Sequence, residues 1–186
     1  MTTYIPSLTL PAFVFEQPAV SILLPVVCGT AIGYSISPTK ESQRQYRATK
    51  QPPLHPPAWL FGPVWTSLYL TMGYTAYRAW TTGTSSFDPR MVRLAKQGAT
   101  LYTIQLALNF IWTPLFFGLR RPIAATADIV ALSGVTGYLA YVWGQVDPVC
   151  GWLLVPYLGW LSFATYLCAG AGYLNDWDLN TAGKKE

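Results

Sequence analysis

Long runs of residues without a charged side chain constrain this sequence more than any other feature. Each run is 17 residues or longer, and an α-helix needs about 20 residues, with a range of about 17 to 25, to cross the hydrocarbon core of a bilayer. Four runs cover residues 20–36, 57–77, 97–119 and 148–175, and a fifth, residues 122–146, is interrupted only by Asp128. The runs predict an all-α integral membrane protein with five transmembrane helices.

The composition supports a lipid bilayer as the surroundings of these helices. Of the 186 residues, 52% are apolar and 11% are charged, whereas a soluble domain has about 25% charged residues. The helices of a water-soluble bundle would each need a polar face, which these runs lack. We therefore expect one domain, residues 1–186, that folds as a single compact bundle. Its helices are expected at about residues 20–36, 57–80, 96–118, 122–146 and 149–174, with a structured proline-rich loop at residues 38–56.

Basic residues are distributed unevenly between the two ends of the predicted bundle. With five spans, the first loop, the third loop and the C-terminal tail lie on one side and carry four, two and two Lys or Arg residues, eight in all. The other side carries four, at Arg78, Arg90, Arg93 and Lys96. The positive-inside rule therefore predicts that the first loop and the C-terminus face the cytosol. The net charge of +4 is therefore explained by the membrane topology. Nucleic-acid binding is not predicted, because no basic face outside the membrane is interleaved with aromatic residues.

Residues 1–17 precede the first run and contain one acid, Glu16, but no Lys or Arg. A secretory signal needs a basic beginning and a mitochondrial presequence needs arginines, so neither is predicted. We expect this segment to be a short disordered or interfacial tail.

A GxxxG pattern lies in the first predicted helix, at Gly29 and Gly33, after Pro25, which should kink the helix. Two glycines at this spacing allow another backbone to approach closely. The pair either packs against a neighbouring helix of the same chain or forms a contact in a homodimer.

A proline-rich strap, residues 52–57, precedes the second predicted helix. Proline fixes φ near −65° and favours extended geometry in the residue before it, so the strap should be stiff. His55 is the only histidine, and no second His, Cys or acid lies close to it in the sequence. We expect it to form loop hydrogen bonds rather than to bind a metal. The expected lid over the bundle consists of His55, Pro56, Pro57 and Trp59.

Aromatic and amide residues recur with helical spacing in three of the predicted helices. The shared faces are Trp65, Tyr69 and Met72 in the second helix, Gln105, Asn109, Trp112 and Phe116 in the third, and Tyr157, Trp160, Ala164 and Cys168 in the fifth. Amides inside a membrane need partners. Gln105 and Asn109 therefore either cross-link neighbouring helices or present hydrogen bonds to a cavity.

Asp128 lies roughly two turns into the fourth predicted helix. An ionisable residue at that depth is a candidate for ligand binding, although it could also bond to Ser, Thr or Tyr hydroxyls and fix the packing. The three cysteines lack metal-ligand spacing and are interpreted as small apolar packing residues. No nucleophile, phosphate-binding or dinucleotide motif is present, so the predicted chemistry is binding without a cofactor or metal.

Three segments, in order along the chain, resemble the translocator protein family, also called the tryptophan-rich sensory protein or peripheral-type benzodiazepine receptor family. They are HPPAWLFGPVWTSLYLTMGY at residues 55–74, LYTIQLALNFIWTPLFFG at 101–118 and PYLGWLSFATYL at 156–167. With Asp128 and the GxxxG pattern, the resemblance extends from the first helix to Leu167. It implies a compact five-helix membrane bundle, often dimeric, that binds porphyrins, sterols and benzodiazepine-type ligands in a pocket closed by the first loop. Animal members lie in the mitochondrial outer membrane.

The resemblance also implies which residues form the pocket. The family positions correspond here to Trp65, Tyr69, Asn109, Trp112, Trp160 and Ala164, and to this set we add Asp128 and Tyr157. The sequence departs from the family at Leu54 and Gln45, where tryptophan is common, and at Cys168, where asparagine is usual. The family's C-terminal sterol motif needs a basic residue shortly after a tyrosine, but Tyr173 is followed by LNDWD.

We therefore expect a membrane receptor or translocator for an apolar planar ligand, a tetrapyrrole or a sterol, which is bound as a ligand rather than as a cofactor. Two alternatives stay open. One is a light- or oxidant-dependent porphyrin-degrading enzyme with Trp65 and Trp160 as redox-active side chains. The other is a structural membrane partner without a ligand. If the protein is eukaryotic, the resemblance implies the mitochondrial outer membrane.

Overall fold

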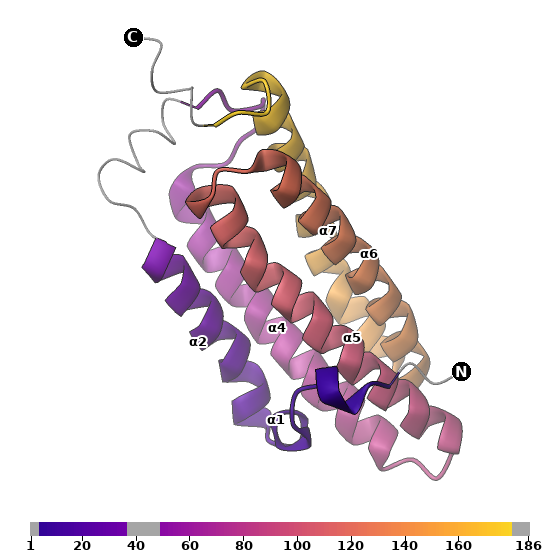
Figure 1. Ribbon diagram of the computed structural model, residues 1–186. Coiled ribbons are helices and arrows are strands. Elements are labelled where there is room, and N and C mark those ends of the chain that lie inside the picture. Colours follow the sequence, from indigo (N-terminus) through magenta and orange to yellow (C-terminus); the bar gives the residue numbers. More distant parts are fainter. Residues whose placement is uncertain (1–3, 37–48, 180–186) are drawn as a thin grey trace.

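The computed structural model describes residues 4–36 and 49–179, which form helices and the loops that connect them. Five long helices run side by side in an elongated bundle (Figure 1). They are α2 (Pro18–Ile36), α4 (Ala58–Thr84), α5 (Pro89–Thr113), α6 (Pro122–Val146) and α7 (Pro148–Leu174). Shorter elements are the 3-10 turn η1 (Pro6–Leu8), the helix α1 (Ala12–Glu16) and the π-helical turn η2 (Pro114–Gly118), which continues α5.

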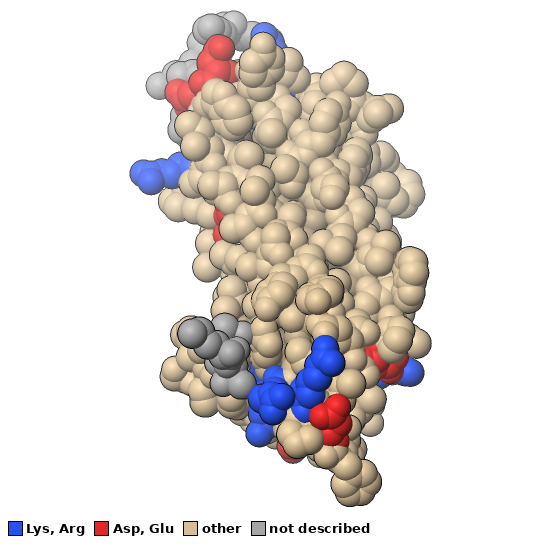
Figure 2. Space-filling view, turned by 90° about the vertical axis from the view of Figure 1, so that its right-hand side faces the viewer, with Lys and Arg blue, Asp and Glu red and all other residues tan. Residues whose placement is uncertain are grey.

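The surface of the bundle is typical of a membrane protein. Four of the described helices are long and apolar enough to cross a bilayer, namely α2, α5 with its π-helical turn, α6 and α7. Charged side chains gather mainly near the two ends of the molecule, and the face between them is nearly all uncharged (Figure 2). The prediction of an all-α membrane protein is therefore confirmed.

The predicted count of five helices is not confirmed. The described residues contain a sixth helix, α1, and α4 is not among the four candidate spans. α4 has the length of a membrane helix, with 27 residues. Its Trp, Tyr, Thr and Gly residues and Arg78 keep the hydropathy of its most apolar stretch below that of the four candidate spans. The Trp and Tyr residues among them also form the aromatic face of α4. The residues that suggest a binding site therefore lower the hydropathy by which a membrane span is recognised.

The third predicted helix begins earlier than expected. α5 starts at Pro89 rather than near residue 96, because the Asp88 carboxylate accepts a hydrogen bond from the Arg90 amide at 2.8 Å and Pro89 occupies the first helical turn. α4 also continues to Thr84 rather than ending near residue 80, so the connection to α5 is short. Arg90 and Arg93, which were predicted to precede the third helix, and Lys96, which was predicted at its start, consequently lie on the first turns of α5.

The N-terminal segment is folded onto the bundle, so the prediction of disorder is wrong for its described part, and an interfacial location stays a prediction. The Ile5 amide donates to Thr100 Oγ1 at 3.2 Å, and the Leu10 amide donates to Thr103 Oγ1 at 3.1 Å. Phe15 is fully buried and stacks on Trp80, with ring centroids 5.2 Å apart. Hydroxyls on α5 thus satisfy the backbone of this segment, and its apolar side chains close one end of the bundle.

Small residues allow α2 to pack closely on α4. Ser21 Oγ donates to the Gly73 carbonyl oxygen at 2.8 Å, and a Cβ at Gly73 would lie only 2.5 Å from Ile22 Cα. A Cβ at Gly29 would meet the Tyr69 ring, 2.8 Å from its hydroxyl oxygen, whereas one at Gly33 would meet nothing within 4 Å. Gly29 of the GxxxG pattern therefore packs within the chain, and Gly33 is left open.

The described part of the first loop lies against α7. Tyr166 Oη donates to the Pro53 carbonyl oxygen at 2.9 Å, and the Asn175 side chain exchanges two hydrogen bonds with the Lys50 backbone. Pro52 is buried, and its Cβ lies 2.8 Å from where a Cβ at Gly170 would be. These contacts hold the start of the proline-rich strap on the C-terminal half of α7. The preceding part of the predicted loop, residues 38–48, lies outside the described residues.

Candidate functional site

A hydrogen-bonded chain of four buried side chains lies at the centre of the bundle. Tyr69 Oη of α4 donates to Asn109 Oδ1 of α5 at 2.7 Å, and Asn109 Nδ2 donates to Tyr157 Oη of α7 at 2.9 Å. Tyr157 Oη in turn donates to Gln105 Oε1 at 3.2 Å. The two amides therefore cross-link three helices, which is one of the two roles that their spacing on α5 allowed.

Aromatic rings surround this polar chain. Trp65 packs on Tyr69, with centroids 5.5 Å apart, and meets the edge of Tyr157 at 6.3 Å. Trp160 contacts the edge of Phe61 at 5.8 Å, which joins α7 to α4. The structure thus brings Trp65 and Tyr69, which were predicted to share a helix face, into contact with each other and Trp65 into contact with Tyr157 of α7. Trp112, Trp160 and Ala164 lie in or against the same apolar core.

Several polar atoms in this interior have no partner among the described residues. Trp160 Nε1 and Gln105 Nε2 are buried donors without a hydrogen-bond acceptor, and the buried Trp112 Nε1 has only the Cys168 thiol, a weak acceptor, beside it. Leaving such a group unpaired costs about 1–3 kcal/mol. All three atoms are donors, so the site presents hydrogen-bond donors within an apolar, aromatic surrounding.

Asp128 is half-buried on α6. Its Oδ2 atom is buried and has no hydrogen-bond partner in the described parts of the chain. The alternative in which a Ser, Thr or Tyr hydroxyl binds this oxygen is therefore not what the structure contains. No described contact links Asp128 to the chain formed by Tyr69, Asn109, Tyr157 and Gln105. Its role in ligand binding stays a prediction.

The predicted lid residues lie at the surface. His55 and Pro57 are exposed, Pro56 is half-buried, and the Trp59 side chain is 71% exposed. The contacts described for the strap are made with α7, through Pro52 and Pro53. The assignment of the strap as a lid over the polar chain therefore stays a prediction as well.

Two residues of the site were not assigned to it from the sequence. Gln105 shares a face with Asn109, so its helical spacing was a usable signal. Thr136 of α6 is fully buried, and its side chain lies against the Tyr157 hydroxyl, although it makes no hydrogen bond of good geometry among the described residues. α6 is rich in small residues and carries no amide or aromatic repeat that would mark this position. Cys150 and Cys168 are buried, as expected for apolar packing residues, and Cys28 is half-buried.

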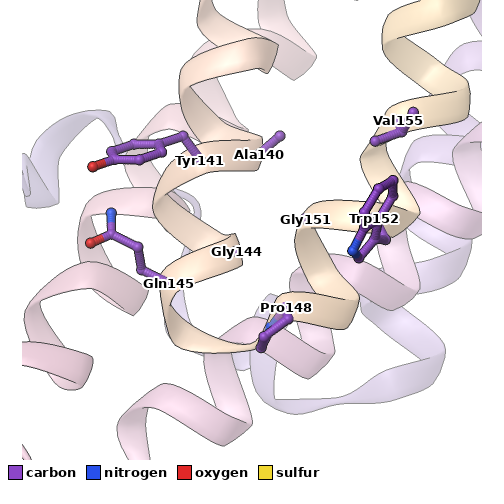
Figure 3. A pocket seen from close by; sticks show the side chains of 8 residues that line it. All are labelled: Ala140, Tyr141, Gly144, Gln145, Pro148, Gly151, Trp152 and Val155. Carbon is purple, nitrogen blue, oxygen red and sulfur yellow. The ribbon is translucent and has the colours of Figure 1, made fainter.

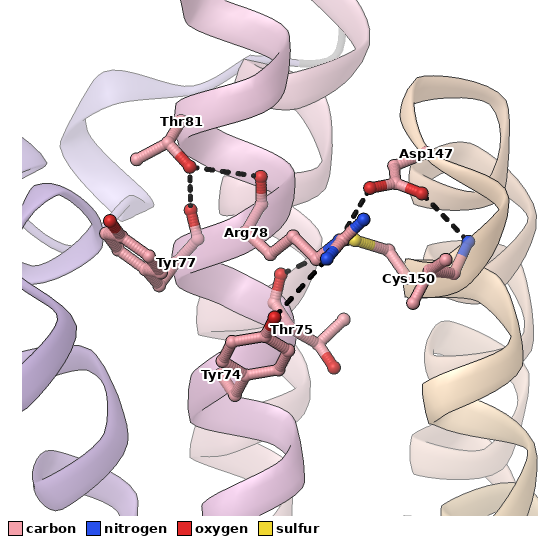
Figure 4. Close-up of polar contacts among 8 residues, drawn as sticks. Tyr74, Thr75, Tyr77, Arg78, Thr81, Asp147 and Cys150 are labelled. Atoms are coloured by element: carbon pink, nitrogen blue, oxygen red, sulfur yellow. Dashed lines mark hydrogen bonds and ion pairs between the residues drawn. The ribbon is translucent and has the colours of Figure 1, made fainter.

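An ion pair joins α4 to α7 away from this site (Figure 4). Arg78 Nε lies 2.6 Å from Asp147 Oδ2, and Arg78 Nη1 donates to Tyr74 Oη at 3.3 Å. The other oxygen of Asp147 accepts from the Val149 amide at 2.9 Å and so caps the first turn of α7. Arg78 was counted among the basic residues of the non-cytosolic side, but its charge is offset by the Asp147 carboxylate.

Comparison with known proteins identifies the family. Residues 21–174 match the TspO/MBR family. This chain belongs to the TspO/MBR family. The match covers the three segments on which the resemblance rested, the GxxxG pattern and Asp128, so the resemblance is confirmed.

Relatives of this TspO/MBR protein come from distant branches of life. A translocator protein homolog of Schizosaccharomyces pombe is 47% identical over 154 residues, which is 82% of this chain and 88% of the relative. The human translocator protein is 38% identical over 148 residues, 74% of this chain and 85% of the relative. A tryptophan-rich protein TspO of Archaeoglobus fulgidus is 41% identical over 139 residues, with coverages of 74% and 85%. The chain therefore aligns with most of the length of each relative.

Proposed function

We propose that this TspO/MBR protein is a membrane receptor or translocator that binds an apolar planar ligand, a tetrapyrrole or a sterol, inside the helix bundle. The observation that carries the proposal is the buried indole N–H of Trp160, which has no acceptor among the described residues, together with the buried Gln105 amide N–H, which also has none. A tetrapyrrole carboxylate or a sterol hydroxyl would supply an acceptor, while the surrounding rings would contact the flat apolar face.

The position of the tryptophans supports a ligand that spans two helices. Trp65 and Trp160 are only partly buried, one on α4 and the other on α7, and both pack against the same core. A macrocycle between two indoles gains about 0.5–1.5 kcal/mol per aromatic pair beyond the effect of area burial. We infer that Trp65 and Trp160 contact opposite sides of one ligand, next to the polar chain that includes Tyr69 and Tyr157.

Replacing either tryptophan by alanine is expected to weaken porphyrin binding by roughly thirty-fold. The expected cost is about 2 kcal/mol, the scale of a binding hot spot, and about 1.4 kcal/mol corresponds to a factor of ten. Binding is measured as quenching of tryptophan fluorescence by a porphyrin in wild type, Trp65→Ala and Trp160→Ala. Tyr34→Ala is the matched control, because Tyr34 is 84% exposed on α2.

The outcome separates the candidate functions. Unchanged affinity in both tryptophan variants would show that the ligand does not lie between them, and the shared site would be abandoned. Absence of saturable binding in wild type would favour a structural protein whose amides only hold the helices together. Conversion of bound porphyrin to a new product under light would favour an enzyme in place of a receptor.

For the arrangement in the membrane, we propose that α4 also spans the bilayer, in addition to the four candidate spans, which makes five spans in all. The C-terminus would then lie in the cytosol. The basic asymmetry supports this orientation by the positive-inside rule. If the protein is eukaryotic, we propose the mitochondrial outer membrane as its location, by analogy with the family. A homodimer is also proposed, and the open position at Gly33 on α2 leaves room for a close contact there.

The orientation predicts opposite labelling of the two ends. After replacement of the native cysteines, Lys185→Cys should react with a membrane-impermeant thiol reagent added from the cytosol. Ile5→Cys should react only after the membrane is permeabilised, and the 41% exposure of Ile5 leaves that position accessible to the reagent. Mass spectrometry of the labelled protein reports both. The reverse pattern would contradict the proposed orientation.

A further inference from the structure

A hollow of about 390 Å³ lies on the outer surface of the bundle, where α6 and α7 approach each other (Figure 3). It is distinct from the interior site, which is built on α4, α5 and α7. Its lining is mostly apolar. The residues that line it are Ala140, Tyr141, Gly144, Gln145, Pro148, Gly151, Trp152 and Val155.

Two glycines form the floor of this groove. A Cβ at Gly151 would lie 3.1 Å from Gly144 Cα and 3.3 Å from the Ala140 carbonyl oxygen, so the two backbones are nearly in contact. Large side chains stand beside this floor, since Tyr141 is 65% and Trp152 is 74% exposed. The floor therefore carries no side chains, and aromatic rings stand among the residues that line the groove.

A cation is held at the rim of the groove. Arg90 Nη2 donates to Gln145 Oε1 at 2.9 Å, and Gln145 itself lines the groove. Among residues 4–36 and 49–179, the only ion pair is between Arg78 and Asp147, so the Arg90 guanidinium has no carboxylate partner there. The nearby acids are engaged elsewhere, because Asp147 pairs with Arg78 and Asp88 caps α5.

We propose that this groove binds an anionic phospholipid, with an acyl chain on the glycine floor and the phosphate on Arg90. The groove is next to the connection between α6 and α7, so it lies near the end of the bundle, where a headgroup meets the hydrocarbon. Tryptophan and tyrosine prefer that depth of the bilayer. An arginine and a phosphate form charge-assisted hydrogen bonds, which are roughly twice as strong as neutral ones. The proposal does not depend on the function of the interior site.

The test compares two lipids with the same acyl chains and phosphate but a different net headgroup charge, anionic with glycerol and neutral with choline. Delipidated protein in detergent is titrated with phosphatidylglycerol or with phosphatidylcholine of the same acyl chains, and binding is followed by native mass spectrometry. We expect the wild type to prefer phosphatidylglycerol. Arg90→Gln should weaken phosphatidylglycerol binding about tenfold, as expected for loss of a charge-assisted contact. Phosphatidylcholine should lose less, because its choline ammonium already offsets the charge of its phosphate. Trp152→Ala should weaken both lipids about threefold, since one wall of the groove is lost.

Matched variants separate a specific site from general attraction. Arg93→Gln removes the same charge one turn further along α5, and Tyr173→Ala removes a side chain that is 76% exposed at the other end of α7. Both should bind phosphatidylglycerol within twofold of wild type. An equal loss with Arg93→Gln would overturn the proposal, because the attraction would be diffuse.

Two further results would also overturn the proposal. One is displacement of phosphatidylglycerol by soluble glycerol phosphate, which would show a headgroup site without an acyl chain. The other is a change from dimer to monomer in Trp152→Ala with lipid binding unchanged, which would make the groove a contact between two copies. Both are read from the same mass spectra.

Discussion

Gly73→Ala is expected to destabilise the protein by about 3 kcal/mol. The new Cβ would lie 2.5 Å from Ile22 Cα and closer still to the Ser21 carbonyl oxygen. Both atoms belong to the backbone of α2, so no side chain can rotate away, and α2 must move from α4 as a whole. Overpacking typically costs 1–3 kcal/mol, and the upper end applies where backbone is the obstacle. The bond from Ser21 Oγ to the Gly73 carbonyl oxygen would be lost with the same movement.

Unfolding in detergent, by heat or by titration with sodium dodecyl sulfate, measures this effect. Gly134→Ala is the control, because a Cβ at Gly134 on α6 would meet nothing within 4 Å. It should be neutral or slightly stabilising, since alanine is the better helix former by roughly 0.5–1 kcal/mol. Equal stability of the two variants would mean that α2 and α4 do not cross as closely as described.

Phe15→Ala is expected to lower the free energy of unfolding by about 3–4 kcal/mol. If detaching the N-terminal segment from the bundle requires less free energy than this, the segment will detach instead. Phe15 is fully buried, stacks on Trp80 at 5.2 Å and meets the edge of Tyr102 at 5.9 Å. Truncation of a buried phenylalanine typically costs 3–5 kcal/mol through lost contacts and the cavity that remains. The cavity would open among Trp80, Tyr102 and the α1 backbone, at one end of the bundle.

The control for this variant lies two residues away. Phe13 belongs to the same helix, α1, but its side chain is 56% exposed, so Phe13→Ala should change stability little. Limited proteolysis of the N-terminus reports release of the segment, and thermal unfolding reports the global cost. Faster cleavage or a lower unfolding temperature is expected for Phe15→Ala only. If both variants behave as wild type, the segment does not pack on the bundle.

Helical periodicity in the sequence predicted much of the candidate site. Trp65 and Tyr69, four residues apart, share a face of α4, and Asn109 and Gln105 share one of α5. Asn109 bonds both Tyr69 and Tyr157, so the predicted faces of α4, α5 and α7 are turned toward one another. Such faces are local properties of a helix, and buried amides have few alternatives to pairing with each other.

Other features depended on contacts between segments that are far apart in the chain. The composition of the N-terminal segment suggested only a tail, yet Thr100 and Thr103 on α5 bind its backbone, and Phe15 fills a space between α4 and α5. Arg78 was assigned to a side of the membrane by its charge alone, whereas its geometry makes it the partner of Asp147. The residues on one helix face do not indicate which side chain from a distant segment will pair with them.

The sequence by itself therefore determined the class of protein, the family, the extent of α6 and the aromatic and amide faces, because these follow from composition and from spacing within one helix. Only the tertiary structure decided how α2 packs on α4 at Gly73, where the N-terminal segment lies and which polar atoms keep no partner. It also decided that Arg90 reaches Gln145 at the edge of a groove. The physical reason is that close backbone approach and hydrogen-bond pairing are set by how whole helices are placed against one another, and no local pattern encodes that placement.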